Sequence, residues 1–362
     1  MKRLFIISLL FLSVGFGQNT TDEPNPMKGV KTQIKSIYEF EEKFGEFNEI
    51  FKEKTIYKYD SDGKKVEDSY YDSEGNLTEG DWGYSKFIYK YDTNGNKVEQ
   101  SRYDSDGSLK SKYISTYDSN GNQVESSWYN SDGSLKNKFI YKYDTNGNKV
   151  EESYYDSDGS LSFKFIYKYD TNGNEVEKSR YDSDGSLKYK YIYKYDSNGN
   201  QVEWSRYDSD GSLMWKTIYT YDSNGNKVEW SRYDSDGSLM WKTISKYNSN
   251  GNKVESSWYN YSDGSLKDKS ISKYDSNGNQ VEQTRYDSDG SLKDKSISKY
   301  DSNGNKVERS NYHSDESLNW KYIYKYDTKN RIVELIKYNF GLKFGQLQQT
   351  LTEKYIYEYE EY

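Results

Sequence analysis

The chain has 362 residues, a formal net charge of −8, one histidine and no cysteine. Without cysteine it forms no disulfides, and zinc sites of the usual cysteine and histidine kind are excluded. The acidic balance also argues against nucleic acid as a partner, because a protein that binds phosphates needs an excess of positive charge.

The N-terminus has the pattern of an export signal. Lys2 and Arg3 precede an apolar run from Leu4 to Phe16, which is too short to span a membrane as a stable helix. Residues 1–17 are therefore predicted to be a signal peptide, with a buried first element as the alternative. Residues 18–29 hold both prolines and are predicted to be a flexible linker. We expect a secreted, periplasmic or cell-surface protein that does not span a membrane.

Residues 30–60 resemble a degenerate first copy of the repeat that follows. Ile37–Phe40 and Ile56–Tyr59 share one pattern, and Gly45 between them is a candidate turn. We expect strands here, and a glutamate-rich helix over residues 39–54 is the alternative. Residues 30–362 are predicted to form a single repeat domain with atypical units at both ends.

A near copy of the segment from Tyr191 to Leu213 recurs every 26 residues for most of the chain, with one additional residue near Tyr261. Each copy holds one Asn-Gly and one Asp-Gly turn signal, and the segments between them are rich in Tyr, Val, Ile and Trp. The turn glycines of the Asn-Gly type are Gly95, Gly121, Gly147, Gly173, Gly199, Gly225, Gly251, Gly278 and Gly304. The pattern predicts an all-β fold, a long antiparallel meander of about 22 strands. We expect an elongated, twisted sheet, and curling of the sheet on itself is left open. Disorder is the alternative for so polar a chain, but the regular β pattern argues against it.

The side chains indicate a register. A two-residue loop at Asn198-Gly199 sets Tyr193 opposite Trp204 and Lys194 opposite Glu203, and the next turn sets Arg206 opposite Trp215. What we call the aromatic face then carries Leu187, Tyr189, Tyr191, Tyr193, Tyr195, Val202, Trp204, Arg206, Leu213 and Trp215. The opposite, charged face carries Lys188, Lys190, Ile192, Lys194, Glu203, Ser205 and Tyr207.

Two other places depart from the repeat. The unit after Asp60 has six additional residues near 78–85, with Trp82 among them. Insertions of this kind are usually neutral loops, although function also gathers there. Near the C-terminus Glu316 and Asn330 stand where glycines are expected, and residues 355–359 form the last predicted strand.

The motif Tyr-Asp-x-x-Gly-Asn-x-Val occurs at residues 91–98, 143–150 and 195–202. It resembles the YD-repeat (Rhs-type) family over about residues 55–338. That family usually has Arg and Leu after the glycine, and here only Arg331-Ile332 comes close. The resemblance implies a bacterial, secreted or surface-exposed protein whose repeats form a shell around a toxic domain or make carbohydrate and surface contacts.

Catalysis is not expected. His313 is the sole histidine, the carboxylates recur with every unit, and the glycines lie in hairpins instead of phosphate-binding loops. We predict no catalytic residue, no cofactor and no metal site. Segments such as Asp104–Gly107 resemble calcium loops, but turn chemistry accounts for their Asp and Gly.

The aromatic face is the candidate binding surface. Its rings and arginines can simply pack as a sheet core, with Arg206 stacked on Trp215 as a cation–π pair. If part of the face is exposed, it offers a platform for sugar rings or a cell-surface protein. The candidate ligand-binding residues are Trp204, Trp215, Trp230, Trp241, Trp258, Arg206 and Arg232. We therefore expect a non-catalytic extracellular scaffold or binding module. Polysaccharide or cell-wall binding is the alternative, and a toxin-shell relative without a toxin domain is the second alternative.

Overall fold

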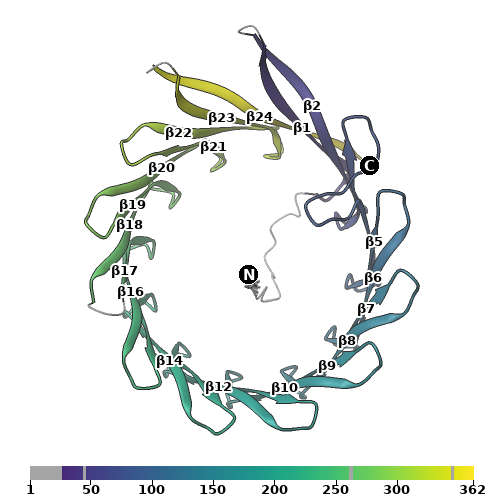
Figure 1. Cartoon of the computed structure of the whole chain (residues 1–362), viewed down its shortest axis with the longest axis vertical. Helices are drawn as coiled ribbons and strands as arrows, with labels where there is room; N and C mark the ends of the chain where they lie inside the picture. The colour runs from purple at the N-terminus through teal and green to yellow at the C-terminus, as the bar shows by residue number, and fades with distance from the viewer. Residues whose placement is uncertain (1–26, 44–45, 261–263, 344–345) are drawn as a thin grey trace, which may run out of the picture.

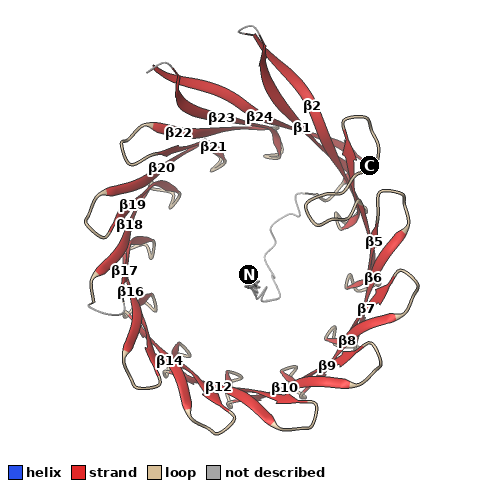
Figure 2. Ribbon diagram, viewed as in Figure 1, coloured by secondary structure: helices blue, strands red, loops and turns tan. Residues whose placement is uncertain are grey.

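The structure is a computed structural model and describes residues 27–43, 46–260, 264–343 and 346–362. Within these ranges the chain forms strands and turns only (Figures 1 and 2), and no helix is long and apolar enough to cross a membrane. The predicted signal peptide, most of the predicted linker and the candidate turn at Gly45 lie outside the described residues.

The strands are β1 (Val30–Lys43), β2 (Glu46–Tyr59), β3 (Lys65–Asp72), β4 (Lys86–Tyr91), β5 (Lys97–Tyr103), β6 (Leu109–Tyr117), β7 (Gln123–Asn130), β8 (Leu135–Tyr143), β9 (Lys149–Asp156), β10 (Leu161–Tyr169), β11 (Glu175–Asp182), β12 (Leu187–Tyr195), β13 (Gln201–Asp208), β14 (Leu213–Tyr221), β15 (Lys227–Asp234), β16 (Leu239–Tyr247), β17 (Lys253–Tyr259), β18 (Leu266–Tyr274), β19 (Gln280–Asp287), β20 (Leu292–Tyr300), β21 (Lys306–Tyr312), β22 (Leu318–Tyr326), β23 (Ile332–Lys343) and β24 (Gln346–Glu361).

The sheet is an antiparallel meander, as predicted, but it closes into a ring. Each strand pairs with its neighbours in sequence, and β24 also pairs with β1. Figure 1 shows the chain passing once around the ring until its yellow end meets its purple beginning. The expected elongated shape was wrong. The sheet curls until it closes, because the accumulated twist and curvature of 24 strands bring the two edges together. Closure removes the exposed edges of an open sheet.

The Asn-Gly turns are longer than predicted. Gly199 N–H donates to the Asp196 carbonyl (3.1 Å), and Asp196 N–H donates to the Asn200 carbonyl (2.9 Å). Gly199 alone takes a positive φ, of 81°, and Tyr195 pairs with Gln201 through a bulge. The two-residue loop was therefore wrong.

The Asp196 carboxylate explains this geometry. Its Oδ1 accepts the N–H groups of Asn198 and Asn200, each at 2.9 Å, which closes the turn around the aspartate. The bulge absorbs the additional residue. Beyond it the predicted register is confirmed, because Lys194 pairs with Glu203 and Tyr193 with Trp204.

The tyrosine that precedes each of these aspartates has a structural role. Tyr195 Oη donates to the Glu175 carbonyl (2.9 Å), and Tyr221 Oη donates to the Gln201 carbonyl (2.8 Å). The first bond joins β12 to β11 and the second joins β14 to β13, in each case at the end of the strand pair that has no connecting turn. The Tyr-Asp pair of the repeat therefore fastens successive hairpins to one another.

The charged face satisfies its own polar groups. Glu203 accepts from Lys194 Nζ (3.0 Å) and from Ser205 Oγ (2.8 Å), and Ser205 is fully buried. Burial alone raises the pKa of Glu203, but these two bonds and the positive charges of Lys194 and Lys216 outweigh it, so the pKa is lowered. The same Lys-Glu-Ser arrangement recurs at Lys168, Glu177 and Ser179. The negative charge of each of these glutamates is therefore balanced by the lysine beside it.

The seam between β1 and β24 has its own polar network. Gln33 Nε2 donates to Tyr359 Oη (3.2 Å), and its Oε1 accepts from Tyr59 Oη (3.0 Å). The main chain continues the contact, since Tyr362 N–H donates to the Gly29 carbonyl (3.0 Å). These bonds join residues from both ends of the chain.

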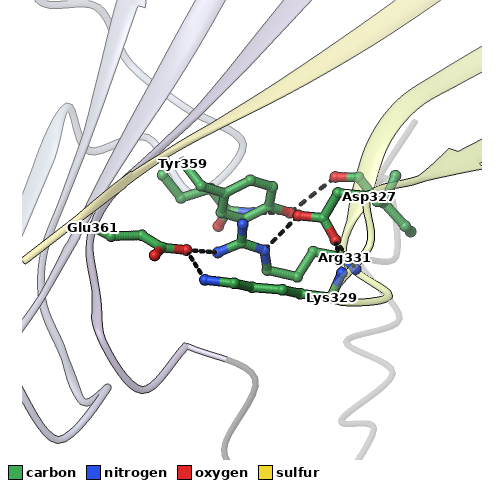
Figure 3. Close-up of polar contacts among 7 residues, drawn as sticks. Asp327, Lys329, Arg331, Tyr359 and Glu361 are labelled. Atoms are coloured by element: carbon green, nitrogen blue, oxygen red, sulfur yellow. Dashed lines mark hydrogen bonds and ion pairs between the residues drawn. The ribbon is translucent and has the colours of Figure 1, made fainter.

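Arg331 stands beside this network (Figure 3). Its Nε lies 2.7 Å from Asp327 Oδ2, and its Nη1 lies 3.1 Å from Glu361 Oε1. The guanidinium also lies over the Tyr359 ring, 4.3 Å from its centre, and Lys329 pairs with Glu361. The last turn of the repeat is therefore tied to the last strand of the ring.

Candidate ligand-binding face

The two faces of the sheet differ in how much they vary from unit to unit. On the charged face, the Glu and Ser of the odd-numbered strands recur in every unit from β3 to β21, apart from Thr284. The aromatic-face position between them is Asp68, Gln100, Ser126, Glu152, Lys178, Trp204, Trp230, Ser256, Gln283 and Arg309 in turn. A constant framework thus presents a variable face, which is the arrangement expected of a recognition surface on a repeat scaffold.

The predicted tryptophans lie on this face as two close pairs and one separate ring. Trp204 and Trp215 meet edge to face with their centroids 4.8 Å apart, and Trp230 and Trp241 do so at 5.0 Å. Trp258 is contacted by Lys267 Nζ, 4.2 Å from the ring centre. Trp230 and Trp258 are each 39% exposed, so part of the aromatic surface remains available to solvent.

The arginines stack differently from the prediction. Arg206 pairs with Trp215 in register, as expected, but its guanidinium lies over Tyr189, 4.5 Å from the ring centre. Trp215 is instead covered by Arg232, at 3.7 Å. The guanidinium stacks on the diagonal neighbour because the long arginine side chain reaches past the residue directly opposite.

Three arginines form a row across alternate strands. Arg180, Arg206 and Arg232 lie on β11, β13 and β15, each stacked on an aromatic ring of the preceding strand. Each has a buried Nε without a hydrogen-bond partner, and within the described ranges none forms an ion pair with a carboxylate. Burial lowers the pKa of Arg232. The row is thus a set of cations whose hydrogen-bonding capacity is not filled by the protein.

The next part of the ring along the chain is different. Arg285 occupies the same position in its unit, but it makes two contacts with Asp294, at 2.9 and 2.6 Å. A bidentate pair of this kind neutralises the guanidinium. The aromatic face is therefore aromatic and cationic around β11–β16 and polar with paired charges around β18–β21.

Sequence reasoning missed a pocket at the insertion. Trp82 is 77% exposed at its rim, and Asp68 and Arg102 lie in its wall. The six additional residues were the available signal, since they depart from the repeat.

The Asp-Gly turns use their carboxylates locally. Asp132 Oδ1 accepts from Ser134 N–H (2.9 Å) and from Ser134 Oγ (2.6 Å), and Asp158 does the same with Ser160. Among the described residues, no three His, Cys, Asp or Glu side chains come together as a metal site would require.

No family model matches the chain, and no curated protein matches it. The predicted membership of the YD-repeat family therefore stays a prediction.

Solved structures provide distant neighbours. The Photorhabdus luminescens Tc holotoxin pore matches at 12% identity and a TM-score of 0.39, over 87% of this chain and 19% of that one. A TcdB2–TccC3 complex matches at 11% identity and a TM-score of 0.33, again over 87% and 19%. A porin-like protein from Bacteroides uniformis matches at 10% identity and a TM-score of 0.26, over 92% and 98%. The chain spans about a fifth of the Tc proteins that it resembles.

Proposed function

We propose that this chain is an exported, non-catalytic binding protein whose aromatic face holds an extended acidic polysaccharide. The observation that carries the proposal is the row of Arg180, Arg206 and Arg232, each stacked on an aromatic ring and none paired with a carboxylate in the described part of the chain. Rings and unpaired guanidinium groups on one face provide both contacts that such a polymer needs.

The aromatic rings favour a sugar polymer. Exposed Trp230 and Trp258 present flat apolar surface, on which the C–H face of a pyranose can pack. The rings and arginines continue across many strands, so the surface suits a chain that lies across it better than a compact substrate. The variable residues would then adapt each unit to a different part of the polymer.

The arginines favour an acidic polymer. They recur on every second strand, which places them roughly 10 Å apart. That spacing is comparable with the length of a disaccharide, so one acidic group in each repeating unit could meet each guanidinium. Arginine binds carboxylates and sulfates with two parallel hydrogen bonds. The net charge of −8 would repel such a polymer elsewhere, so binding depends on this part of the face.

Affinity electrophoresis tests the proposal. The purified chain without residues 1–17 is run through gels that contain polygalacturonate or the neutral polymer dextran. We expect retardation by polygalacturonate that weakens with salt. The double variant Arg206→Gln with Arg232→Gln should bind at least about tenfold more weakly.

Arg285→Gln is the matched control, because that arginine is already paired with Asp294. Its polygalacturonate binding should equal that of the parent chain. Equal retardation by both polymers, or an equal loss in both arginine variants, would refute the assignment of this face.

A further inference from the structure

The six additional residues form a loop that folds over the aromatic face. Residues 78–83 are fastened by Thr78 N–H to the Tyr70 carbonyl (3.0 Å) and by Gly80 N–H to the Tyr84 carbonyl (3.0 Å). Gly80 lies so close to the Tyr70 ring that a Cβ would come within 2.8 Å of it. This close approach requires glycine and holds the loop down on the sheet.

The loop forms part of the wall of an open cavity of about 670 Å³. Its lining comes from strands β2 to β5 and from the loop, and consists of Tyr57, Lys65, Asp68, Tyr70, Trp82, Tyr84, Phe87, Tyr89, Gln100 and Arg102. The regular units lack these six residues. The cavity is therefore a local feature of β3–β5 and is separate from the row of arginines on β11–β15.

Asp68 is the decisive residue of the cavity. It is 4% exposed, and its Oδ2 accepts from Lys65 Nζ at 3.2 Å. Its Oδ1 is buried and has no hydrogen-bond partner in the described ranges. Burial and the nearby Asp68 carboxylate raise the pKa of Tyr70 and of Tyr89. The Tyr70 and Tyr89 hydroxyls lie close to the same carboxylate and hydrogen-bond with it. Oδ1 itself still lacks a donor in good geometry, so it can accept one supplied from outside the protein.

A donor faces the same cavity. Arg102 has a buried Nε without a partner among the described residues, and its guanidinium lies over the Tyr84 ring, 5.2 Å from the centre. Phe87 and Tyr89 stack with their centroids 6.3 Å apart and give the cavity an aromatic wall. One free acceptor, one free donor and a flat apolar wall thus converge in one place.

We infer that this pocket binds a single pyranose unit of a saccharide. One ring hydroxyl would donate to Asp68 Oδ1, and another would accept from Arg102 Nε. The C–H face of the sugar would pack on the aromatic wall, with Trp82 closing over it. A flat apolar ligand would leave Asp68 unpaired, and a cationic ligand would meet both Lys65 and Arg102.

This inference deepens the proposed function, since it rests on carbohydrate as the ligand class. The two sites remain separable. The row of arginines would hold an acidic chain, whereas the pocket would hold one sugar unit through hydroxyl groups and needs no acidic group on it.

The test is calorimetric titration with a panel of methyl pyranosides (gluco, galacto, manno and N-acetylglucosamine forms). At least one should bind the parent chain in a saturable manner and change Trp82 fluorescence. Asp68→Asn should weaken that binding by at least about tenfold, because the amide replaces a charged acceptor. Deleting residues 78–83 restores the spacing of a regular unit and should abolish binding while the circular dichroism spectrum is unchanged.

Polygalacturonate retardation provides the second readout. The loop deletion should retain it, and the Arg206→Gln and Arg232→Gln double variant should retain pyranoside binding. Loss of polymer binding alone would therefore count against the proposed function and not against the pocket. The pocket assignment is overturned if no pyranoside binds, if Asp68→Asn and the loop deletion bind as well as the parent chain, or if tetramethylammonium binds instead of a sugar.

Discussion

The guanidinium of Arg232 lies 3.7 Å from the centre of the Trp215 ring, although the backbone register places Thr217 opposite Arg232. The contact is therefore a diagonal one between β14 and β15. It recurs between Arg206 and Tyr189, two strands away. The row of arginines on the aromatic face is built from this diagonal stacking.

A double-mutant cycle can measure the contact. Arg232→Met keeps the apolar stem but removes the charge, and Trp215→Leu removes the ring. We expect a coupling of about 1 kcal/mol in unfolding free energy, the value typical of a partly buried cation–π pair. The control is the cycle for Arg206 and Trp215, which are opposite in register but are not stacked. A larger coupling there would contradict the diagonal arrangement.

The repeat allowed the strands and most of the register to be predicted. Glycine at each turn and apolar residues in alternation are local signals, so the pairing of Lys194 with Glu203 and of Arg206 with Trp215 followed from them. Closure could not be predicted in this way. The pairing of Ile37 with Tyr355 depends on curvature accumulated over all strands, and no local pattern contains it.

The candidate site shows the same limit. The tryptophans were identified from their positions along the strands. Their exposure could not be predicted in the same way, because it depends on the packing of neighbouring rings. The partners of Arg206 and Arg232 required coordinates, because side-chain length decides between the direct and the diagonal neighbour. The pocket at Asp68 required them as well, since the loop reaches the face through a turn that departs from the repeat.

Arg331 should stabilise the seam. Its side chain is 13% exposed and is paired with Asp327 and Glu361. Arg331→Ala leaves Asp327 without its ion-pair partner and Glu361 with Lys329 alone, and we expect a loss of about 2 kcal/mol in unfolding free energy by denaturant titration. Arg309→Ala is the control, because it removes a stacked arginine away from the seam. Similar losses in both variants would mean that the seam has no special role.

Glu316 is a site at which a substitution should stabilise the protein. It has a positive φ of 63° in the turn where other units have glycine. Glu316→Gly relieves this strain at some cost in chain entropy, so we expect a net gain of about 0.5–1 kcal/mol. Asn330 also has a positive φ, but it accepts a bond from Asn305 Nδ2 at 3.0 Å. Asn330→Gly should therefore bring no gain. Thermal melting of both variants checks the contrast.

The tyrosines make the fold sensitive to alkali. Burial, with other tyrosines nearby, raises the pKa of Tyr59 and of Tyr357 to about 12. An unfolded tyrosine titrates near 10, so the folded state holds more protons between these values and stability falls as pH rises from about 10 to about 12. Tyrosinate absorbance and circular dichroism, followed together, should show most ionisation and loss of sheet signal in one transition. Complete ionisation before unfolding would contradict this.

The closed ring predicts that deletions depend on parity. Removing residues 170–195 deletes β11 and β12, which leaves an even number of strands, so the first and last strands can still pair antiparallel. Removing residues 170–182 deletes β11 alone, and the last strand would then run parallel to β1. We expect the first variant to fold with a modestly lower Tm and the second to remain open and aggregate through its edges.

Cross-linking across the seam provides the measurement. Lys31 and Glu360, whose side chains meet at 3.0 Å, are both replaced by cysteine. A short bismaleimide should join them in the full chain and in the first variant but not in the second. Equal cross-linking in both deletions would show that closure does not require an even number of strands.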